Sequence, residues 1–193
     1  MDVAILDYGA GNVKSVQFAL ERLGVTAQLT NDPEKIRSAE RIIFPGQGQA
    51  AMAMKKLKEH GFDRMLPELK QPVLGICLGM QLLFEQTAEG PTQGLGIIPG
   101  NIQKFTHHKI PQMGWNRVVE LKGALFQGIS EGTYMYLVHS YYAPLVSETQ
   151  AEADYGLRYS VAVQKNNFNG VQFHPEKSSA AGQRLLQNFL EIE

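Results

Sequence analysis

The sequence predicts an α/β fold: an open, mostly parallel, flavodoxin-like sheet flanked by helices, with an antiparallel strand extension in its second half. In the first half, short apolar runs typical of strands alternate with segments whose apolar residues fall at helical spacing. This order builds a parallel sheet with right-handed crossovers. In the second half, strand-like runs follow one another with turns between them, which favours antiparallel pairing.

In the first half, four short apolar runs indicate strands that are buried on both faces. Between them, apolar residues at helical spacing predict helices. The first helix is expected to end at Gly24, and the second to begin at Asp32 and Pro33. The strands are expected at residues 3–6, 25–29, 42–44 and 73–76, and the other helices at 13–23, 50–60 and 80–85.

The second half is expected to hold shorter strands with longer loops. Residues 90–100 are rich in glycine and proline, which predicts a loop, and the asparagine-rich residues 166–169 are expected to close a hairpin. Ser178 or Ser179 is expected to cap a final helix. The strands are expected at 102–105, 117–121, 134–138, 160–164 and 170–173, and the apolar side of the last helix contains Leu185, Leu186, Phe189 and Leu190.

Size and composition predict one cytoplasmic domain over residues 1–193. This length suits a single well-buried core, and we see neither a signal peptide nor an apolar run long enough to cross a bilayer. A net charge of −1 provides no basic field for nucleic acid or for an anionic membrane. The single cysteine excludes an internal disulfide and fits a reducing compartment.

That cysteine, Cys77, lies between Gly75 and Gly79 where the fourth strand gives way to a helix. A side chain at a sharp strand-to-helix turn projects clear of the backbone, and small residues on both sides make room for the bend. The start of the helix directs N–H groups and partial positive charge at the sulfur, which favours the thiolate. Most lone intracellular cysteines are small buried apolar residues, but this context favours a nucleophile.

A base for this nucleophile is expected in His174-Pro175-Glu176. Residues two apart in an extended segment point to the same side, and Pro175 stiffens the spacing. Glu176 is then placed to accept a hydrogen bond from one nitrogen of His174 while the other faces Cys77. Both segments follow strands, at the edge of an open sheet where sites gather. We therefore expect a catalytic triad of these three residues, the alternative being an exposed turn.

The turn Pro45-Gly46-Gln47-Gly48 also follows a strand. Glycines let backbone N–H groups approach a ligand, so an N–H of Gly46, Gln47 or Gly48, together with that of Leu78, is expected to hold an oxyanion. Losing one such donor typically costs about 3 kcal/mol of transition-state stabilisation. The alternative is a plain β-turn.

Other polar residues give weaker signals. Gln81, one helical turn after Cys77, either contacts a polar substrate or is simply solvated. The glycines at 9 and 11 resemble the start of a dinucleotide loop, but Lys14 stands where the third glycine would be. We expect no cofactor and no metal, since no remaining histidine shows metal-ligand spacing. These histidines are His60, His107, His108 and His139.

Two motifs, residues 75–81 and 171–176, together resemble those of the class I (triad) glutamine amidotransferases. Residues 7–12, 111–116 and 138–142, with Lys177-Ser178, narrow the resemblance to the glutaminase subunits of imidazole glycerol phosphate synthase. The likeness covers essentially the whole chain. It departs at Gln47, where the family often has a small apolar residue between the two glycines.

The resemblance implies that Cys77 attacks the side-chain amide of glutamine and forms a glutamyl thioester, with His174 moving the proton. It implies that ammonia passes to a separate (β/α)8-barrel cyclase subunit, in a heterodimer that serves histidine biosynthesis. It also implies that Gln81, Ser140 and Tyr141 hold glutamine. The residues that it places toward the partner are Asn12, Trp115, Tyr136 and Lys177.

Three alternatives remain open at this point. The glutaminase subunits for anthranilate, aminodeoxychorismate or pyridoxal phosphate synthesis share the triad, although residues 111–116 and Lys177 argue against them. A cysteine peptidase or hydrolase of similar fold would use Cys77 and His174. A non-catalytic flavodoxin-like binding module would keep Cys77 buried and inert.

Overall fold

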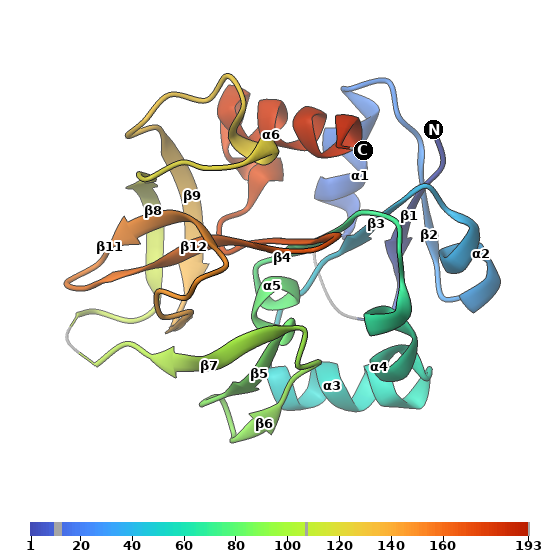
Figure 1. Cartoon of the computed structure of the whole chain (residues 1–193), viewed down its shortest axis with the longest axis horizontal. Coiled ribbons are helices and arrows are strands. Elements are labelled where there is room, and N and C mark those ends of the chain that lie inside the picture. The colour runs from blue at the N-terminus through green and yellow to red at the C-terminus, as the bar shows by residue number, and fades with distance from the viewer. Residues whose placement is uncertain (10–12, 107, 193) are drawn as a thin grey trace.

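A seven-stranded sheet runs through the centre of the computed structural model, which describes residues 1–9, 13–106 and 108–192 (Figure 1). Its order is β11-β12-β13-β4-β3-β1-β2. The strands from β13 to β2 are parallel, whereas β11 and β12 extend the sheet antiparallel, so the predicted class is confirmed. The strands are β1 (Val3–Leu6), β2 (Ala27–Thr30), β3 (Arg41–Phe44), β4 (Val73–Ile76), β11 (Thr149–Asp154), β12 (Arg158–Lys165) and β13 (Phe168–Val171).

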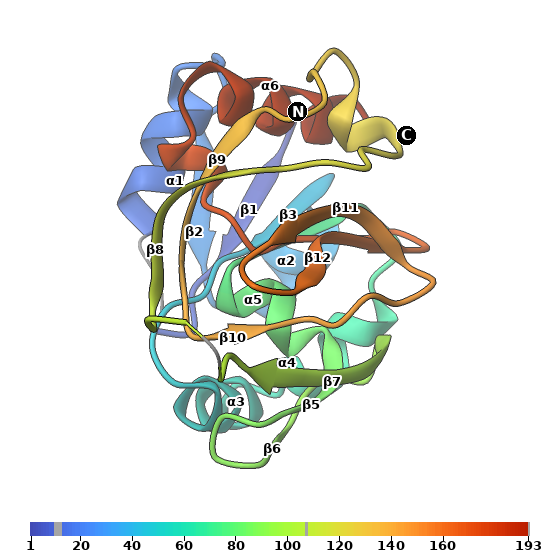
Figure 2. The ribbon, with the colours of Figure 1, turned by 90° about the vertical axis from the view of Figure 1, so that its left-hand side faces the viewer.

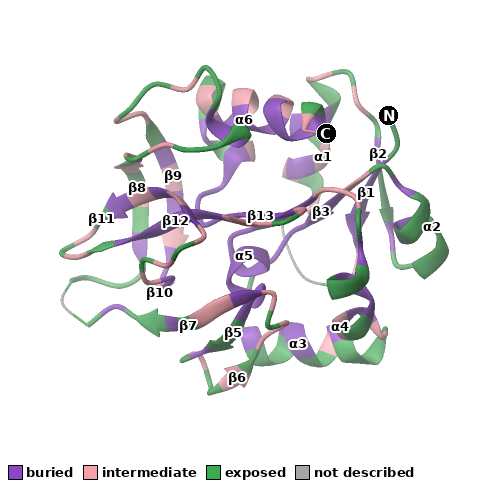
Figure 3. Ribbon diagram, viewed as in Figure 1, coloured by how far each residue is buried: buried purple, intermediate pink, exposed green. Residues whose placement is uncertain are grey.

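Helices cover both faces of this sheet and create two cores (Figures 1 and 3). Because successive side chains of a strand point to opposite faces, Val3 and Ile5 of β1 enter one core, while Ala4 and Leu6 enter the other. The first core includes α1 (Val13–Glu21) and α6 (Ser179–Glu191), and the second includes α2 (Pro33–Ser38), α3 (Ala50–Glu59), α4 (Phe62–Met65) and α5 (Leu78–Leu82). No helix among the described residues is long and apolar enough to cross a membrane.

The bounds predicted for the helix at 80–85 are wrong at both ends. It begins at Leu78 as α5, and the chain enters strand β5 (Phe84–Thr87) after Leu83. The apolar run from Leu82 to Phe84 suits a buried strand as well as a helix. This strand belongs to a second sheet, of order β10-β7-β5-β6, with β6 (Thr92–Gln93), β7 (Ile98–Lys104) and β10 (Tyr141–Tyr142).

The loop expected at 90–100 is therefore interrupted by β6 and by the start of β7. Its glycines partly serve packing: a Cβ atom at Gly94 would lie 2.1 Å from the carbonyl oxygen of Phe84. A close backbone approach of this kind admits only glycine, so glycine content alone was a misleading signal for a loop.

The strand expected at 117–121 is also wrong. The structure has β8 (Gln112–Arg117) instead, and Glu120 has a φ of 56°, which ends the extended run. β8 pairs antiparallel with β9 (Tyr134–His139) to form a two-stranded ribbon, visible edge-on in Figure 2. One face of this ribbon is buried through Met135 and Leu137, and the other presents Met113 and Trp115 to solvent.

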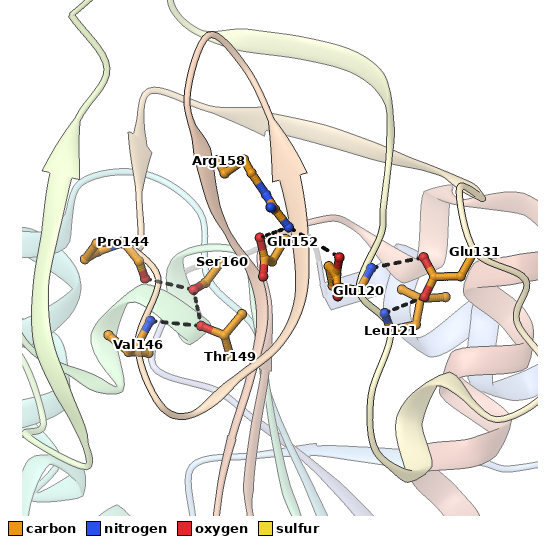
Figure 4. A network of polar contacts seen from close by, with 9 residues as sticks. All are labelled: Glu120, Leu121, Glu131, Pro144, Val146, Thr149, Glu152, Arg158 and Ser160. Carbon is orange, nitrogen blue, oxygen red and sulfur yellow. Dashed lines mark hydrogen bonds and ion pairs between the residues drawn. The ribbon is translucent and has the colours of Figure 1, made fainter.

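Short polar contacts hold the antiparallel extension to the segment after β10 (Figure 4). The N–H of Val146 donates to Thr149 Oγ1, and the Ser160 hydroxyl donates to the carbonyl of Pro144 at 2.8 Å. The two hydroxyl oxygens lie 2.6 Å apart. At the outer end, Arg158 pairs with Glu152 at 2.7 Å. Because the Thr149 and Ser160 hydroxyls are buried, their bonds position the segment that leads back to Tyr141, whereas the exposed Arg158 forms a separate ion pair.

Candidate active site

Cys77 occupies a strained turn between β4 and α5. Its φ of 55° and ψ of −110° lie outside the regions favoured by residues with a Cβ atom. The glycine at 79 is required by close approach, because a Cβ there would lie 2.0 Å from the carbonyl oxygen of Phe44. A Cβ at Gly46 would lie 2.6 Å from the nitrogen of Gly79. The Cys77 turn and the Pro45–Gly48 turn therefore pack backbone against backbone.

Cys77 opens onto a cavity of about 390 Å³ at the carboxyl edge of the parallel strands. This is the place where open α/β sheets bind ligands. Most of the predicted catalytic, oxyanion and substrate residues line it. Those that line it are Gln47, Gly48, Cys77, Leu78, Gln81, Ser140, Tyr141 and His174, together with Lys177 from the predicted interface. Gly46 packs below the cavity against the Cys77 turn, and Glu176 lies behind His174.

The His174 ring is buried and bonded to Glu176, with Nδ1 2.8 Å from Oε1. Burial alone would lower the pKa of His174, but the hydrogen bonds and charges of Cys77 and Glu176 raise it to about 9. The structure therefore favours an imidazolium beside the sulfur, the pairing that activates a cysteine nucleophile. The second oxygen, Glu176 Oε2, is buried without a hydrogen-bond partner among the described residues.

The segment that carries His174 and Glu176 is not extended, although the sequence predicted that it would be. Residues Pro175–Lys177 form a 3₁₀ turn, and β13 already ends at Val171. Ser178 starts α6 as expected, but its hydroxyl does not cap the helix. It donates to the carbonyl of His174 at 2.7 Å and accepts from the N–H of Tyr136 at 2.9 Å. Tertiary bonds to the ribbon thus replace the cap and hold the turn.

His139 lies in the cavity wall and is nearly fully buried. Burial lowers its pKa to about 4, with a smaller opposing effect from its bond to the carbonyl of Tyr141. Its Nδ1 is 2.7 Å from that carbonyl oxygen and its Nε2 is 3.3 Å from the hydroxyl of Tyr159. Since a carbonyl only accepts, the neutral ring carries its proton on Nδ1.

Sequence reasoning missed the role of Gln172. This side chain is fully buried, with Nε2 3.7 Å from Cys77 Sγ and Oε1 2.8 Å from Gln81 Nε2. The available signal was its position two residues before His174. Tyr8 is also buried and donates to the carbonyl of Pro45 at 2.7 Å. Burial and the charge of Cys77 raise the pKa of Tyr8, which keeps its hydroxyl protonated.

Three of the four residues expected to face a partner lie in the part of the chain that the structure describes. Trp115 is 52% exposed and packs edge-on against Tyr136, with ring centroids 6.0 Å apart, on the outer face of the ribbon. Lys177 is exposed at the cavity. Asn12 lies outside the described residues.

An α/β fold with a cysteine at a strand-to-helix turn, a buried imidazole beside it and a carboxylate behind the ring is the arrangement of a cysteine-dependent amide-cleaving enzyme. The family model for glutamine amidotransferase class-I matches residues 4–192. The chain is 48% identical over 196 aligned positions to the imidazole glycerol phosphate synthase subunit HisH of Bacteroides fragilis, with full coverage of both chains. The chain belongs to the class-I glutamine amidotransferases, and within them to the family of these HisH subunits.

A second relative of the same name, from Colwellia psychrerythraea, is 44% identical and covers 98% of this chain and 92% of its own. Solved structures show the same fold at low identity. A glutamine amidotransferase crystal structure superposes with a TM-score of 0.78 at 21% identity, covering 99% of this chain and 98% of that one. A putative GMP synthase subunit from Thermoplasma acidophilum gives 0.77 at 18% identity, covering 99% and 92%.

Proposed function

We propose that this chain is the glutaminase subunit of an imidazole glycerol phosphate synthase, folded as one domain and active in the cytoplasm. It hydrolyses glutamine at Cys77 and delivers the ammonia to a separate (β/α)8-barrel cyclase subunit. The cyclase uses the ammonia to make imidazole glycerol phosphate and aminoimidazole carboxamide ribotide. The observation that carries the proposal is the buried His174–Glu176 pair beside Cys77, in a chain 48% identical to a HisH subunit.

In this reaction the Cys77 thiolate attacks the side-chain carbonyl carbon of glutamine, and the oxygen becomes an anion. Backbone N–H groups of Leu78 and the Pro45–Gly48 turn stabilise that anion. His174 gives its proton to the departing nitrogen, ammonia leaves, and a glutamyl thioester remains. Water, deprotonated by His174, then attacks the thioester, and glutamate leaves as the Cys77 thiolate is restored.

The orientation of Gln81 determines what it offers the substrate. Its Nε2 donates to the carbonyl of Tyr141 at 3.0 Å and to Gln172 Oε1 at 2.8 Å. Both N–H groups are engaged, so the oxygen of this cavity-lining amide is left to accept a hydrogen bond. We assign it to the ammonium group of glutamine, with the backbone at Ser140 and Tyr141 beside it.

Glutaminase activity is expected to persist in mildly alkaline solution and to fall as pH rises through about 9. The pKa of His174 is raised from 6.5 to about 9, so the imidazolium that pairs with the thiolate is lost only there. The protonated His174 ring also stabilises the fold, and this contribution to the free energy of unfolding is complete below pH 6.5 and is lost as pH rises through about 9. The measurement is kcat/KM for glutamine against pH, with circular dichroism to exclude unfolding. An alkaline limb centred near pH 6.5 would contradict this assignment.

The outer face of the ribbon is the proposed docking surface for the cyclase. This face presents the exposed aromatic side chain of Trp115. The ribbon is also bonded to the proposed base, since the N–H of His174 donates to the carbonyl of Tyr136 in β9 at 2.9 Å. We propose that activity is low until the cyclase and its ligand bind, because only then are the oxyanion donors of the exposed turn containing Gln47 and Gly48 correctly aimed. We propose that Lys177, which is exposed at the cavity, also contacts the cyclase, as the resemblance implies for Asn12, which lies outside the described residues. Enclosure by the partner also keeps ammonia away from water, which would protonate it.

Glutamate release with and without the cyclase and its ligand tests this function. Trp115→Ala is expected to raise the cyclase concentration needed for half-maximal activation by about tenfold or more, because exposed aromatic anchors dominate interface energy. Leu29→Ala is the matched control, since Leu29 is 39% exposed on β2, an edge strand of the seven-stranded sheet and not part of the ribbon. Equal rates with and without cyclase would contradict the activation, and no release in either case would contradict the glutaminase assignment.

A further inference from the structure

The backbone carbonyl of Tyr141 fixes the orientation of two hydrogen-bonded side-chain amides, those of Gln81 and Gln172. The oxygen of Tyr141 receives two donors: Gln81 Nε2 at 3.0 Å and His139 Nδ1 at 2.7 Å. A carbonyl oxygen has two lone pairs and no proton, so both partners must present N–H groups to it. The amide of Gln81 therefore has only one orientation compatible with this bond.

The orientation of Gln81 in turn fixes that of Gln172. The second N–H of Gln81 needs an acceptor, and Gln172 Oε1 lies 2.8 Å away. The amide nitrogen of Gln172 must then point in the other direction, where it lies 3.7 Å from Cys77 Sγ. Gln172 is fully buried, so bulk water does not compete for either bond.

The sulfur consequently lies between one donor and one acceptor. Besides the amide of Gln172, the carbonyl of Val138 lies 3.9 Å from Sγ and accepts from the thiol form. An N–H donor favours the thiolate, and a hydrogen bond to an ion is about twice as strong as a neutral one. Loss of the donor therefore favours the thiol.

We propose that Gln172 is a positioning residue for the glutaminase reaction, which holds the thiolate of Cys77 with its N–H and the substrate-binding amide of Gln81 with its oxygen. This inference rests on the proposed function. One side chain thereby sets both the reactive form of the nucleophile and the acceptor that glutamine meets. The role is distinct from that of His174, which transfers the proton.

Two substitutions separate the two bonds of Gln172. Gln172→Glu keeps an acceptor for Gln81 but turns a carboxylate oxygen toward the sulfur. Gln172→Met has similar length and removes both bonds. Both substitutions are expected to lower kcat at least about tenfold, because each removes the hydrogen bond to the charged sulfur. Gln172→Glu is expected to leave KM nearly unchanged. Gln172→Met is expected to raise KM, because it also removes the bond to Gln81.

Alkylation by iodoacetamide reports on the sulfur without any glutamine turnover, since Cys77 is the only cysteine in the chain. At pH 7 both variants are expected to react at least about tenfold more slowly than wild type, with the midpoint of the alkylation profile displaced to higher pH. Gln81→Met, which releases Gln172 without touching the sulfur, is expected to move the profile in the same direction. This third variant keeps the test decisive if one substitution at 172 prevents folding.

Gln164→Met is the matched control. Gln164 lies on β12 opposite Asn169, at the end of the hairpin away from Cys77. It is expected to leave the alkylation profile, kcat and KM unchanged. Wild-type alkylation profiles and kinetics in both variants at 172 would overturn the inference while leaving the glutaminase assignment intact. A wild-type chain that alkylates readily but releases no glutamate with its cyclase would instead overturn the proposed function.

Discussion

Cys77→Ala is expected to abolish glutamine hydrolysis, lowering kcat by about 10⁴-fold or more. In triad enzymes the loss of the nucleophile costs nearly as much as the loss of the whole triad, because the other members act only through it. Here the His174–Glu176 pair and the proposed oxyanion donors have no substitute for the sulfur, since the chain contains no other cysteine. Glutamate release by the subunit assembled with its cyclase is the measurement.

The same variant supplies its own control, because ammonia made at Cys77 is replaceable by ammonia added to the solution. The assembled Cys77→Ala enzyme is expected to retain cyclase activity with ammonium salts at alkaline pH. Loss of both activities would indicate a defective cyclase instead of a missing nucleophile. Glutamine hydrolysis within tenfold of wild type would show that Cys77 is not the nucleophile.

Gly79→Ala is expected to destroy both the site and much of the stability of the fold. The added Cβ would lie 2.0 Å from the carbonyl oxygen of Phe44, an atom of the central strand β3 that is covered on both sides by neighbouring strands. The turn must therefore move, taking the sulfur and the Leu78 N–H with it. Overpacking of this severity costs about 3 kcal/mol or more, which lowers the melting temperature by about 6 °C or more for a chain of this size.

Gly24→Ala is the comparison that separates steric overlap from backbone strain. Gly24 has a φ of 77°, and a Cβ there would meet nothing within 4 Å. Only the cost of a left-handed alanine applies, about 1–2 kcal/mol, and glutaminase activity is expected to be unchanged. If Gly79→Ala melted no lower than Gly24→Ala and kept its activity, the backbone contact between the two turns would not be what shapes the site.

The first half of the fold was predictable because its elements are coded locally. Apolar runs such as Val3–Leu6 and Val73–Ile76 are buried on both faces, and helical spacing separates them. The second half depends on contacts between distant segments. β5 was read as the continuation of a helix because its partner β7 lies beyond a glycine-rich loop, and local sequence does not reveal that pairing.

In the proposed site, too, local sequence signals identified some residues, and contacts between distant segments determine the rest. The two glycines around Cys77 and the spacing of His174 and Glu176 pointed to Cys77 and His174, which do line one cavity, and to Glu176, which is bonded to His174 behind it. The spacing argument assumed an extended segment, whereas a 3₁₀ turn brings the two side chains together. Gln172 and His139 lie within the segments 171–176 and 138–142 that carry the resemblance, but no role was predicted for either side chain. The carbonyl of Tyr141 orients His139 directly, from two residues further along the chain. It orients Gln172 only through the amide of Gln81, a contact between distant segments.

The backbone of the proposed triad is hydrogen-bonded to two different elements. The N–H of Cys77 is bonded to Val171 in the rigid central sheet at 2.8 Å, whereas the N–H of His174 is bonded to Tyr136 in the peripheral ribbon at 2.9 Å. A tilt of the ribbon is therefore expected to move the ring, together with the Val138 carbonyl 3.9 Å from Sγ, relative to the backbone of Cys77. We therefore expect a partner that binds at Trp115 to change the distance between the Cys77 sulfur and the His174 ring.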